Sequence, residues 1–105
     1  MYENGKIYMG LAGDKRVELA LNMCNRHGLI AGASGTGKTI TMKVMAESFS
    51  DAGVPVFLCD VKGDVAGICA PGQSSEGMEK RIDKFGLRDR FVYQGYPTTF
   101  WMFIR

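Results

Sequence analysis

Hydrophobic and polar residues alternate with a period of two in the first part of the chain. The alternating apolar positions are Ile7, Met9 and Leu11, and then Val17, Leu19 and Leu21. Because successive side chains of a strand point to opposite faces, this alternation predicts two β-strands. The intervening Gly13, Asp14 and Lys15 are typical of a tight turn. We therefore expect a β-hairpin within residues 1–27.

The pattern changes after residue 28 to short apolar runs separated by a helical stretch. Residues 29–31 and 54–59 are apolar runs too short for helices, which is typical of strands buried on both faces of a parallel sheet. Between them, residues 40–49 carry apolar side chains at helical spacing, and Gly53 is suited to a left-handed helix end. Residues 28–64 are thus predicted to form a βαβ unit.

The remaining residues, 65–105, give weaker signals. Residues 71–77 are expected to form a loop, and Ser75 is a candidate cap for a short helix with Met78, Ile82 and Phe85 on its apolar side. Gly86 would end that helix. Residues 91–93 are a candidate strand, and residues 100–103 form an aromatic tail. We interpret 65–105 as an incomplete C-terminal part of one α/β domain.

Composition narrows the possible classes of protein. The 105 residues fit one domain, and the net charge of +2 is too small to indicate a nucleic-acid partner by itself. No apolar stretch is long enough to span a bilayer, so we expect a cytoplasmic protein without membrane contact. The three cysteines are expected to be reduced, buried thiols, and a single histidine gives a zinc site little support.

Residues 32–39 read Gly-Ala-Ser-Gly-Thr-Gly-Lys-Thr and satisfy the phosphate-loop (Walker A) pattern at every position. Glycines let the backbone bend so that several amide N–H groups converge on one anion, and the helix that follows adds the positive end of its dipole. The expected ligand is ATP with Mg²⁺. The predicted nucleotide-binding residues are Gly32, Ala33, Ser34, Gly35, Thr36, Gly37, Lys38, Thr39 and Ile40.

Two of these residues have individual roles in the prediction. Lys38 is the expected catalytic residue because its ammonium group reaches the β- and γ-phosphates, and the Thr39 hydroxyl is the expected Mg²⁺ ligand.

Asp60 is a second candidate Mg²⁺ ligand. It follows an apolar run directly, as a Walker B acid does. The alternative, which we favour, is that Asp60 ends a strand and caps the turn that follows. With Lys62 and Asp64 it would still lie at the carboxyl end of a strand, where open α/β sheets bind ligands.

The segments 25–39 and 53–64 extend well beyond a bare phosphate loop. Together they resemble the YjgR-type group of bacterial HerA-like ATPases, in the HerA–FtsK branch of P-loop motor proteins, over about residues 17–101. The resemblance implies a RecA-like P-loop NTPase core with a parallel sheet, a ring hexamer, and DNA translocation or unwinding driven by ATP.

Members of this group are several hundred residues long, and their Walker B, sensor and arginine-finger residues lie beyond position 105. We therefore expect a truncated P-loop NTPase domain, an N-terminal fragment that binds ATP but is deficient in hydrolysis. Related chains read Trp-Asp-Val or Trp-Asp-Ile near Trp101, and loss of one G from TGG GAT GTT TAT gives Trp-Met-Phe-Ile, as here. We expect a frameshifted or prematurely ended copy of a longer gene.

Two other classes of function stay open. One is a small kinase- or GTPase-like module that uses Asp60 for Mg²⁺, although the Asn-Lys-x-Asp signal of GTPases is missing. The other is a non-enzymatic fragment whose loop is vestigial.

Overall fold

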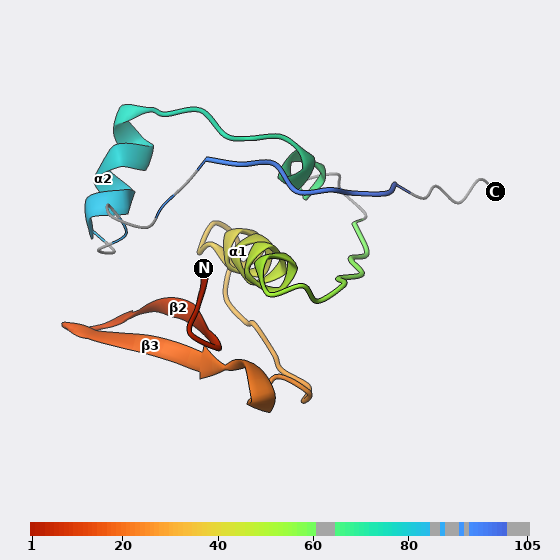
Figure 1. Ribbon diagram of the computed structural model, residues 1–105. Coiled ribbons are helices and arrows are strands. Elements are labelled where there is room, and N and C mark those ends of the chain that lie inside the picture. The colour runs from red at the N-terminus through yellow and green to blue at the C-terminus, as the bar shows by residue number, and fades with distance from the viewer. Residues whose placement is uncertain (61–64, 85–86, 88–90, 92, 101–105) are drawn as a thin grey trace.

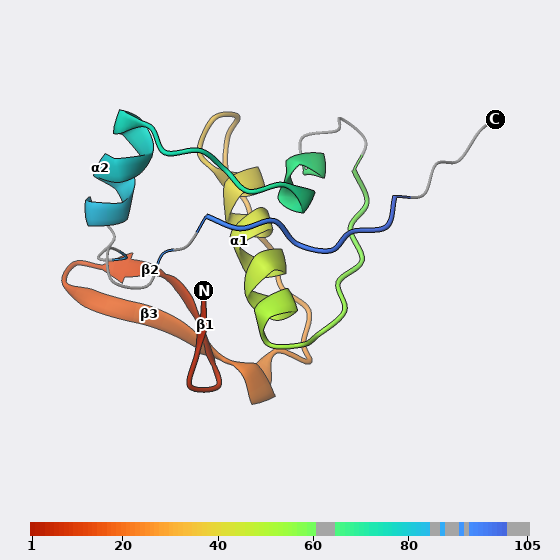
Figure 2. The same ribbon diagram turned by 45° about the horizontal axis from the view of Figure 1, so that its top comes forward.

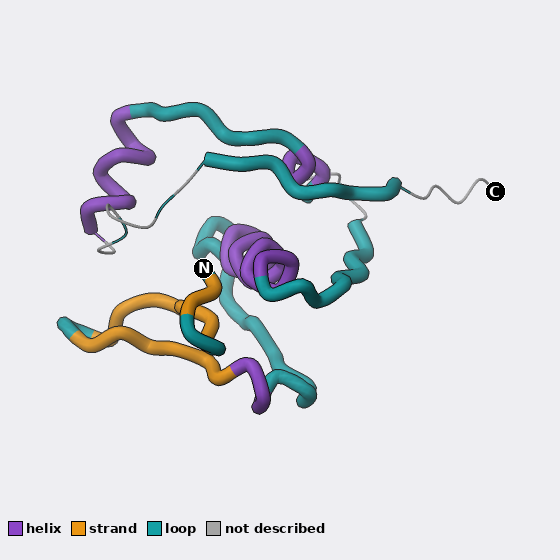
Figure 3. Tube along the Cα trace, viewed as in Figure 1, coloured by secondary structure: helices purple, strands orange, loops and turns teal. Residues whose placement is uncertain are grey.

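The computed structural model describes residues 1–60, 65–84, 87, 91 and 93–100. Within them the chain is a small α/β structure with a three-stranded antiparallel sheet and two α-helices (Figures 1 and 3). The elements are, in chain order, β1 (Tyr2–Glu3), β2 (Lys6–Ala12), β3 (Lys15–Ala20), the 3₁₀ turn η1 (Leu21–Met23), α1 (Lys38–Asp51), the 3₁₀ turn η2 (Ala66–Cys69) and α2 (Glu76–Lys84).

The predicted β-hairpin is confirmed. Strands β2 and β3 pair in antiparallel fashion, with Ala12 opposite Lys15 and the turn at Gly13 and Asp14. Gly13 has φ of 63°, as the first central residue of a type II′ hairpin turn requires. The sequence pattern did not reveal β1, which joins β2 through Asn4 and Gly5. Both have positive φ, 52° and 75°, the geometry of a type I′ turn.

Helix α1 is also where the apolar spacing predicted a helix, and it ends as expected at Gly53. Gly53 has φ of 83°, its N–H donates to the Ser50 carbonyl at 2.9 Å, and the Val54 N–H donates to the Phe49 carbonyl at 2.9 Å. These two bonds are those of a Schellman motif, in which a left-handed glycine satisfies the last carbonyls of the helix.

Helix α2 begins at the predicted cap. The Ser75 hydroxyl accepts a hydrogen bond from the Met78 N–H at 3.2 Å, and Ile82 is buried on the inner side of the helix. The expected end at Phe85 and Gly86 lies outside the described residues.

The elements form three layers, with α1 in the middle (Figures 1 and 2). The sheet covers one side of α1, where β1 and β2 contact it. The segments 65–84 and 93–96 lie on the other side, where Gln94 and Tyr96 donate hydrogen bonds to Asp51 of α1. The small core accordingly draws on all three layers, with Ile7 and Tyr8 from β2, Ala46 from α1, and Val65 and Ile82 beyond it.

The predicted parallel sheet is wrong for the described residues. The sheet is antiparallel, and neither residues 29–31 nor residues 54–59 form a strand. Leu29 and Phe57 are 89% and 83% exposed. A parallel strand needs hydrogen-bonded neighbours and cover on both faces. In the described structure α1 packs against the hairpin instead. Residues 29–31 and 54–59 therefore have neither a neighbouring strand to pair with nor cover on both faces.

Other expectations are also corrected. The three cysteines are free, but Cys59 and Cys69 are exposed and Cys24 is only half-buried. Cys59 is exposed because the run that carries it is not a buried strand. Phe91 and Tyr93 are not in a strand, and Phe100 is exposed. Residues 61–64, 92 and 101–105, including Lys62, Asp64 and Trp101, lie outside the described residues.

The burial of Ile7 gives a first testable prediction. Ile7 is fully buried, whereas Leu11 on the same strand is 38% exposed. Ile7→Ala should lower the free energy of unfolding by about 2–5 kcal/mol, because it removes buried methylenes and leaves a cavity. Leu11→Ala, the matched control, should cost less than half as much. Urea unfolding followed by circular dichroism measures both, and equal losses would show that the packing of β2 on α1 is wrong.

Candidate functional site

The phosphate-loop sequence forms a compact turn at the start of α1. Gly35 and Gly37 have φ of 79° and 95°, a left-handed conformation that a residue with a Cβ rarely adopts. Gly37 is the N-cap of α1, and no side chain caps the helix there. The first turn of α1 also lacks an acidic residue, so the positive end of the helix dipole faces the loop uncompensated.

Three hydrogen bonds converge on one oxygen within this loop. The Ala33 carbonyl accepts from the Thr36 N–H at 3.3 Å, from the Thr36 hydroxyl at 2.6 Å and from the Lys38 Nζ at 2.8 Å. The Lys38 side chain therefore folds back over the loop. Its ammonium group lies beside the backbone that is expected to surround an anion. The rest of the loop, residues 32–37, is exposed.

Gly32 is required by close approach rather than by its own backbone angles. A Cβ at this position would lie 2.6 Å from the Thr36 hydroxyl oxygen. The first glycine of the motif thus stands where the loop backbone lies closest to the Thr36 side chain.

Asp60 does not end a strand, because residues 54–59 form none, and the turn at residues 61–64 that it was expected to cap lies outside the described residues. Its carboxylate accepts a hydrogen bond from the Val65 N–H at 3.3 Å. Among the described residues, no group of three or more His, Cys, Asp or Glu side chains is arranged to hold a metal ion.

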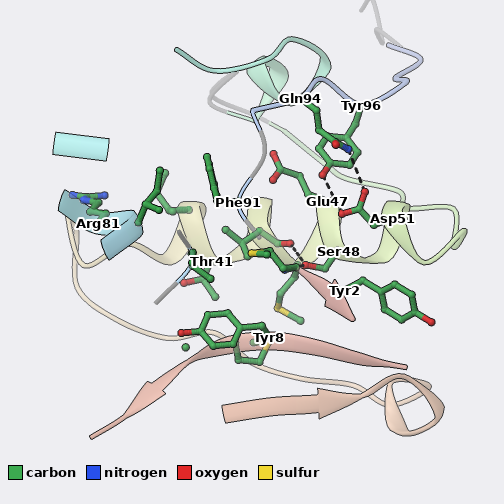
Figure 4. Close-up of a pocket in the computed structure, with 18 of the residues that line it drawn as sticks. Tyr2, Tyr8, Thr41, Glu47, Ser48, Asp51, Arg81, Phe91, Gln94 and Tyr96 are labelled. Atoms are coloured by element: carbon green, nitrogen blue, oxygen red, sulfur yellow. Dashed lines mark hydrogen bonds between the residues drawn. The ribbon is translucent and has the colours of Figure 1, made fainter. Parts of the chain in front are cut away.

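A cavity of about 490 Å³ lies along α1 (Figure 4). Its lining comes from β1, β2, α1 and α2 and from Leu87, Phe91, Gln94 and Tyr96, and it includes Ile40 and Thr41 in the first turn of α1, next to the phosphate loop. Its lining includes the apolar side chains of Val44, Met45 and Ile82. Arg81 and Asp51 lie toward opposite ends in Figure 4.

The acidic end of this cavity is organised around Asp51. Its two carboxylate oxygens accept hydrogen bonds from the Gln94 amide at 3.3 Å and from the Tyr96 hydroxyl at 3.2 Å (Figure 4). Burial and the negative charge of Asp51 raise the pKa of the nearby Glu47. Burial, together with the charges of Asp51 and Glu47, raises the pKa of Tyr96 to about 12.

Comparison with known proteins settles the family. A sequence model described as helicase HerA-like C-terminal matches residues 8–104, nearly the whole chain. The chain belongs to this HerA-like family. No curated protein and no solved structure gives a significant match.

The structure of this HerA-like chain brings together some of the predicted site residues and leaves others apart. Residues 32–38 form one loop closed by Lys38, and Thr39 is half-buried in the first turn of α1. Ile40 is half-exposed and lines the cavity beside the loop. Asp60 accepts a hydrogen bond from the Val65 N–H, which lies outside the loop.

Sequence reasoning missed the cavity and the cluster around Asp51 in the HerA-like chain. No pattern in one sequence could have indicated them, because Asp51 is separated from its partners Gln94 and Tyr96 by more than 40 residues. None of the helices that the structure describes has the length and apolar character needed to cross a bilayer.

The Tyr96–Asp51 contact predicts a pH dependence. Neutral Tyr96 donates to Asp51, and a phenolate cannot. The contribution of this contact to stability should therefore be complete below pH 10, the ordinary tyrosine value, and should be lost as the pH rises through about 12.

The difference in tyrosinate absorbance between the wild type and Tyr96→Phe isolates this titration. Asp51→Asn should move it down toward 10 because the negative charge is removed. A wild-type titration of Tyr96 already near 10 would contradict the contact.

Proposed function

We propose that residues 32–39 bind the phosphates of ATP, together with Mg²⁺. The observation that carries the proposal is that a complete phosphate-loop motif stands at the uncapped N-terminus of a 14-residue helix. Gly35 and Gly37 there have left-handed backbones, and the Lys38 ammonium is folded over the loop. Such a helix start is a natural anion site, because free N–H groups and the helix dipole act on the same spot.

The roles that we assign follow from the chemistry of the side chains. The backbone from Gly32 to Gly37 would cradle the phosphates, and Lys38 would exchange its bond to the Ala33 carbonyl for a phosphate oxygen. The Thr39 hydroxyl would hold Mg²⁺. Ile40 would border the nucleotide. Each of these contacts needs only groups that lie in or next to one loop.

We propose the domain organisation that the sequence predicts: a hairpin lead-in at residues 1–27, a phosphate-binding unit at 28–64 and a further part at 65–105, within a P-loop NTPase domain. Membership of the HerA-like family supports a place in an ATP-driven, helicase-like motor of the YjgR type. In that setting the partners would be DNA and further copies of the chain in a hexameric ring.

We propose nucleotide binding rather than turnover for this stretch of sequence. Hydrolysis needs a residue that orients or activates the attacking water. Asp60, the acid that the sequence offers, is engaged with the backbone of Val65.

Lys38→Ala tests the binding site. It should weaken Mg-ATP binding about 10- to 150-fold, because a charge-assisted hydrogen bond contributes about 1.5–3 kcal/mol. Lys43→Ala removes the same charge from the same helix, outside the motif, and should change the affinity little. Isothermal titration calorimetry measures both. Equal affinity of the wild type and Lys38→Ala, or no binding by the wild type, would refute the proposal.

The same protein preparations distinguish binding from turnover. Asp60→Ala should leave Mg-ATP affinity nearly unchanged, and phosphate release should be negligible in both the wild type and this variant. Substantial wild-type turnover that collapses in Asp60→Ala would instead support the kinase- or GTPase-like alternative.

Gly32→Ala tests the loop geometry itself. The added Cβ would collide with the Thr36 hydroxyl, and the resulting overpacking should cost about 1–3 kcal/mol of loop stability and correspondingly weaken Mg-ATP binding. The double variant Gly32→Ala/Thr36→Ala removes the colliding oxygen and should recover part of the affinity. Gly28→Ala is the control, since nothing lies within 4 Å of its Cβ position. Indistinguishable affinities for the two single variants would rule out this closed loop.

A further inference from the structure

Strand β3 forms one edge of the sheet. The strand order is β1, β2, β3, and among the described residues β3 pairs only with β2. Figures 1 and 2 show it along the outer rim of the molecule, away from α1. An edge strand presents a row of N–H and C=O groups that another strand can pair with.

The direction of these backbone groups is fixed at both ends of β3. In a two-residue hairpin the residues that flank the turn exchange hydrogen bonds, which directs the backbone groups of Lys15 toward Ala12 on β2. At the other end, the Leu21 N–H donates inward to the Gly5 carbonyl at 2.8 Å. Odd-numbered residues therefore face β2, and the backbone groups of Arg16, Glu18 and Ala20 face outward.

This alternation limits how two β3 strands can pair about a two-fold axis. Outward-facing residues must lie opposite outward-facing residues. An axis at Arg16 or at Glu18 would place like charges directly opposite each other, which is destabilising. An axis at Val17 places Arg16 opposite the partner's Glu18, and Glu18 opposite the partner's Arg16. The central sequence Arg-Val-Glu is thus self-complementary in one register.

The side chains of the edge are suited to that register. Arg16 is held with its guanidinium 4.5 Å above the Tyr8 ring. Within the strand, its Nε forms an ion pair with the Glu18 carboxylate at 3.8 Å, which is too long for a hydrogen bond, and the buried Nε has no hydrogen-bond partner among the described residues. Val17 is 44% exposed, so its side chain is open to contact at the axis.

We propose that β3 pairs with β3 of a second copy of this chain, antiparallel and in the register centred on Val17. The two sheets then form one continuous sheet, with two Arg16–Glu18 pairs on either side of a Val17–Val17 contact. This dimer does not depend on nucleotide binding, so its failure and the failure of the proposed ATP site are separate outcomes.

Cysteine cross-linking tests the register directly. In a background with Cys24, Cys59 and Cys69 changed to Ser, Val17→Cys places two thiols opposite each other. Facing Cβ atoms in an antiparallel pair are about 4.5–5.5 Å apart, so small strand movements allow a disulfide. Mild oxidation should give a covalent dimer at least ten times faster than with Lys15→Cys or Leu19→Cys. In the proposed register those like residues are about 13 Å apart along the strands.

Faster cross-linking at position 15 or 19, or equally slow cross-linking at all three positions, overturns the proposal. Mixing Lys15→Cys with Leu19→Cys gives a positive control, because these two residues face each other and should form a mixed dimer.

Charge exchange provides a second measurement. Glu18→Arg sets like charges opposite each other at both flanking pairs and should shift sedimentation of the full chain toward monomer. Arg16→Glu/Glu18→Arg restores the opposite charges and should restore the dimer. Circular dichroism confirms that each variant is folded. A double variant that is folded but stays monomeric, or a wild type that is monomeric at high protein concentration, overturns the proposal.

Discussion

Helix α1 lies between the sheet and the later segments of the chain (Figure 1). The sheet contacts it through β1 and β2. On the other side, Gln94 and Tyr96 are hydrogen-bonded to Asp51 of α1. The N-terminal end of the same helix carries the phosphate loop. A loop of exposed glycines therefore has a rigid base, which is what a preorganised anion site requires.

The parts of the fold that the sequence predicted correctly depend on short-range chemistry. The hairpin follows from alternation around Gly13, the end of α1 from a glycine at position 53, and the start of α2 from the Ser75 hydroxyl. Each of these features is decided within about six residues of chain. Strand β1 was missed although Asn4 and Gly5 form a local turn, because two residues are too few to show alternation.

The incorrect predictions concern properties that only the whole fold decides. The apolar runs at 29–31 and 54–59 were expected to be strands because of their composition, but composition does not supply a pairing partner, and Leu29 and Phe57 are exposed. In the candidate site, the motif predicted which residues form the loop. It did not predict the hydrogen bond from the Lys38 ammonium to the Ala33 carbonyl, because that bond depends on the three-dimensional shape of the loop. The cavity beside the loop was likewise unpredictable, because its walls come from segments distant in sequence.

The carbonyl of Ala33 has a consequence for how the loop changes shape. A carbonyl oxygen has two lone pairs, yet this one accepts from three donors, two on Thr36 and one on Lys38. Rotation of the single peptide unit after Ala33 would break all three bonds together. Rotation of the Thr36 or the Lys38 side chain breaks one bond alone, whereas a flip of this peptide unit releases a hydroxyl, an amide and an ammonium group in the same event. The orientation of this one carbonyl thus decides how many donors of the loop are held inside it.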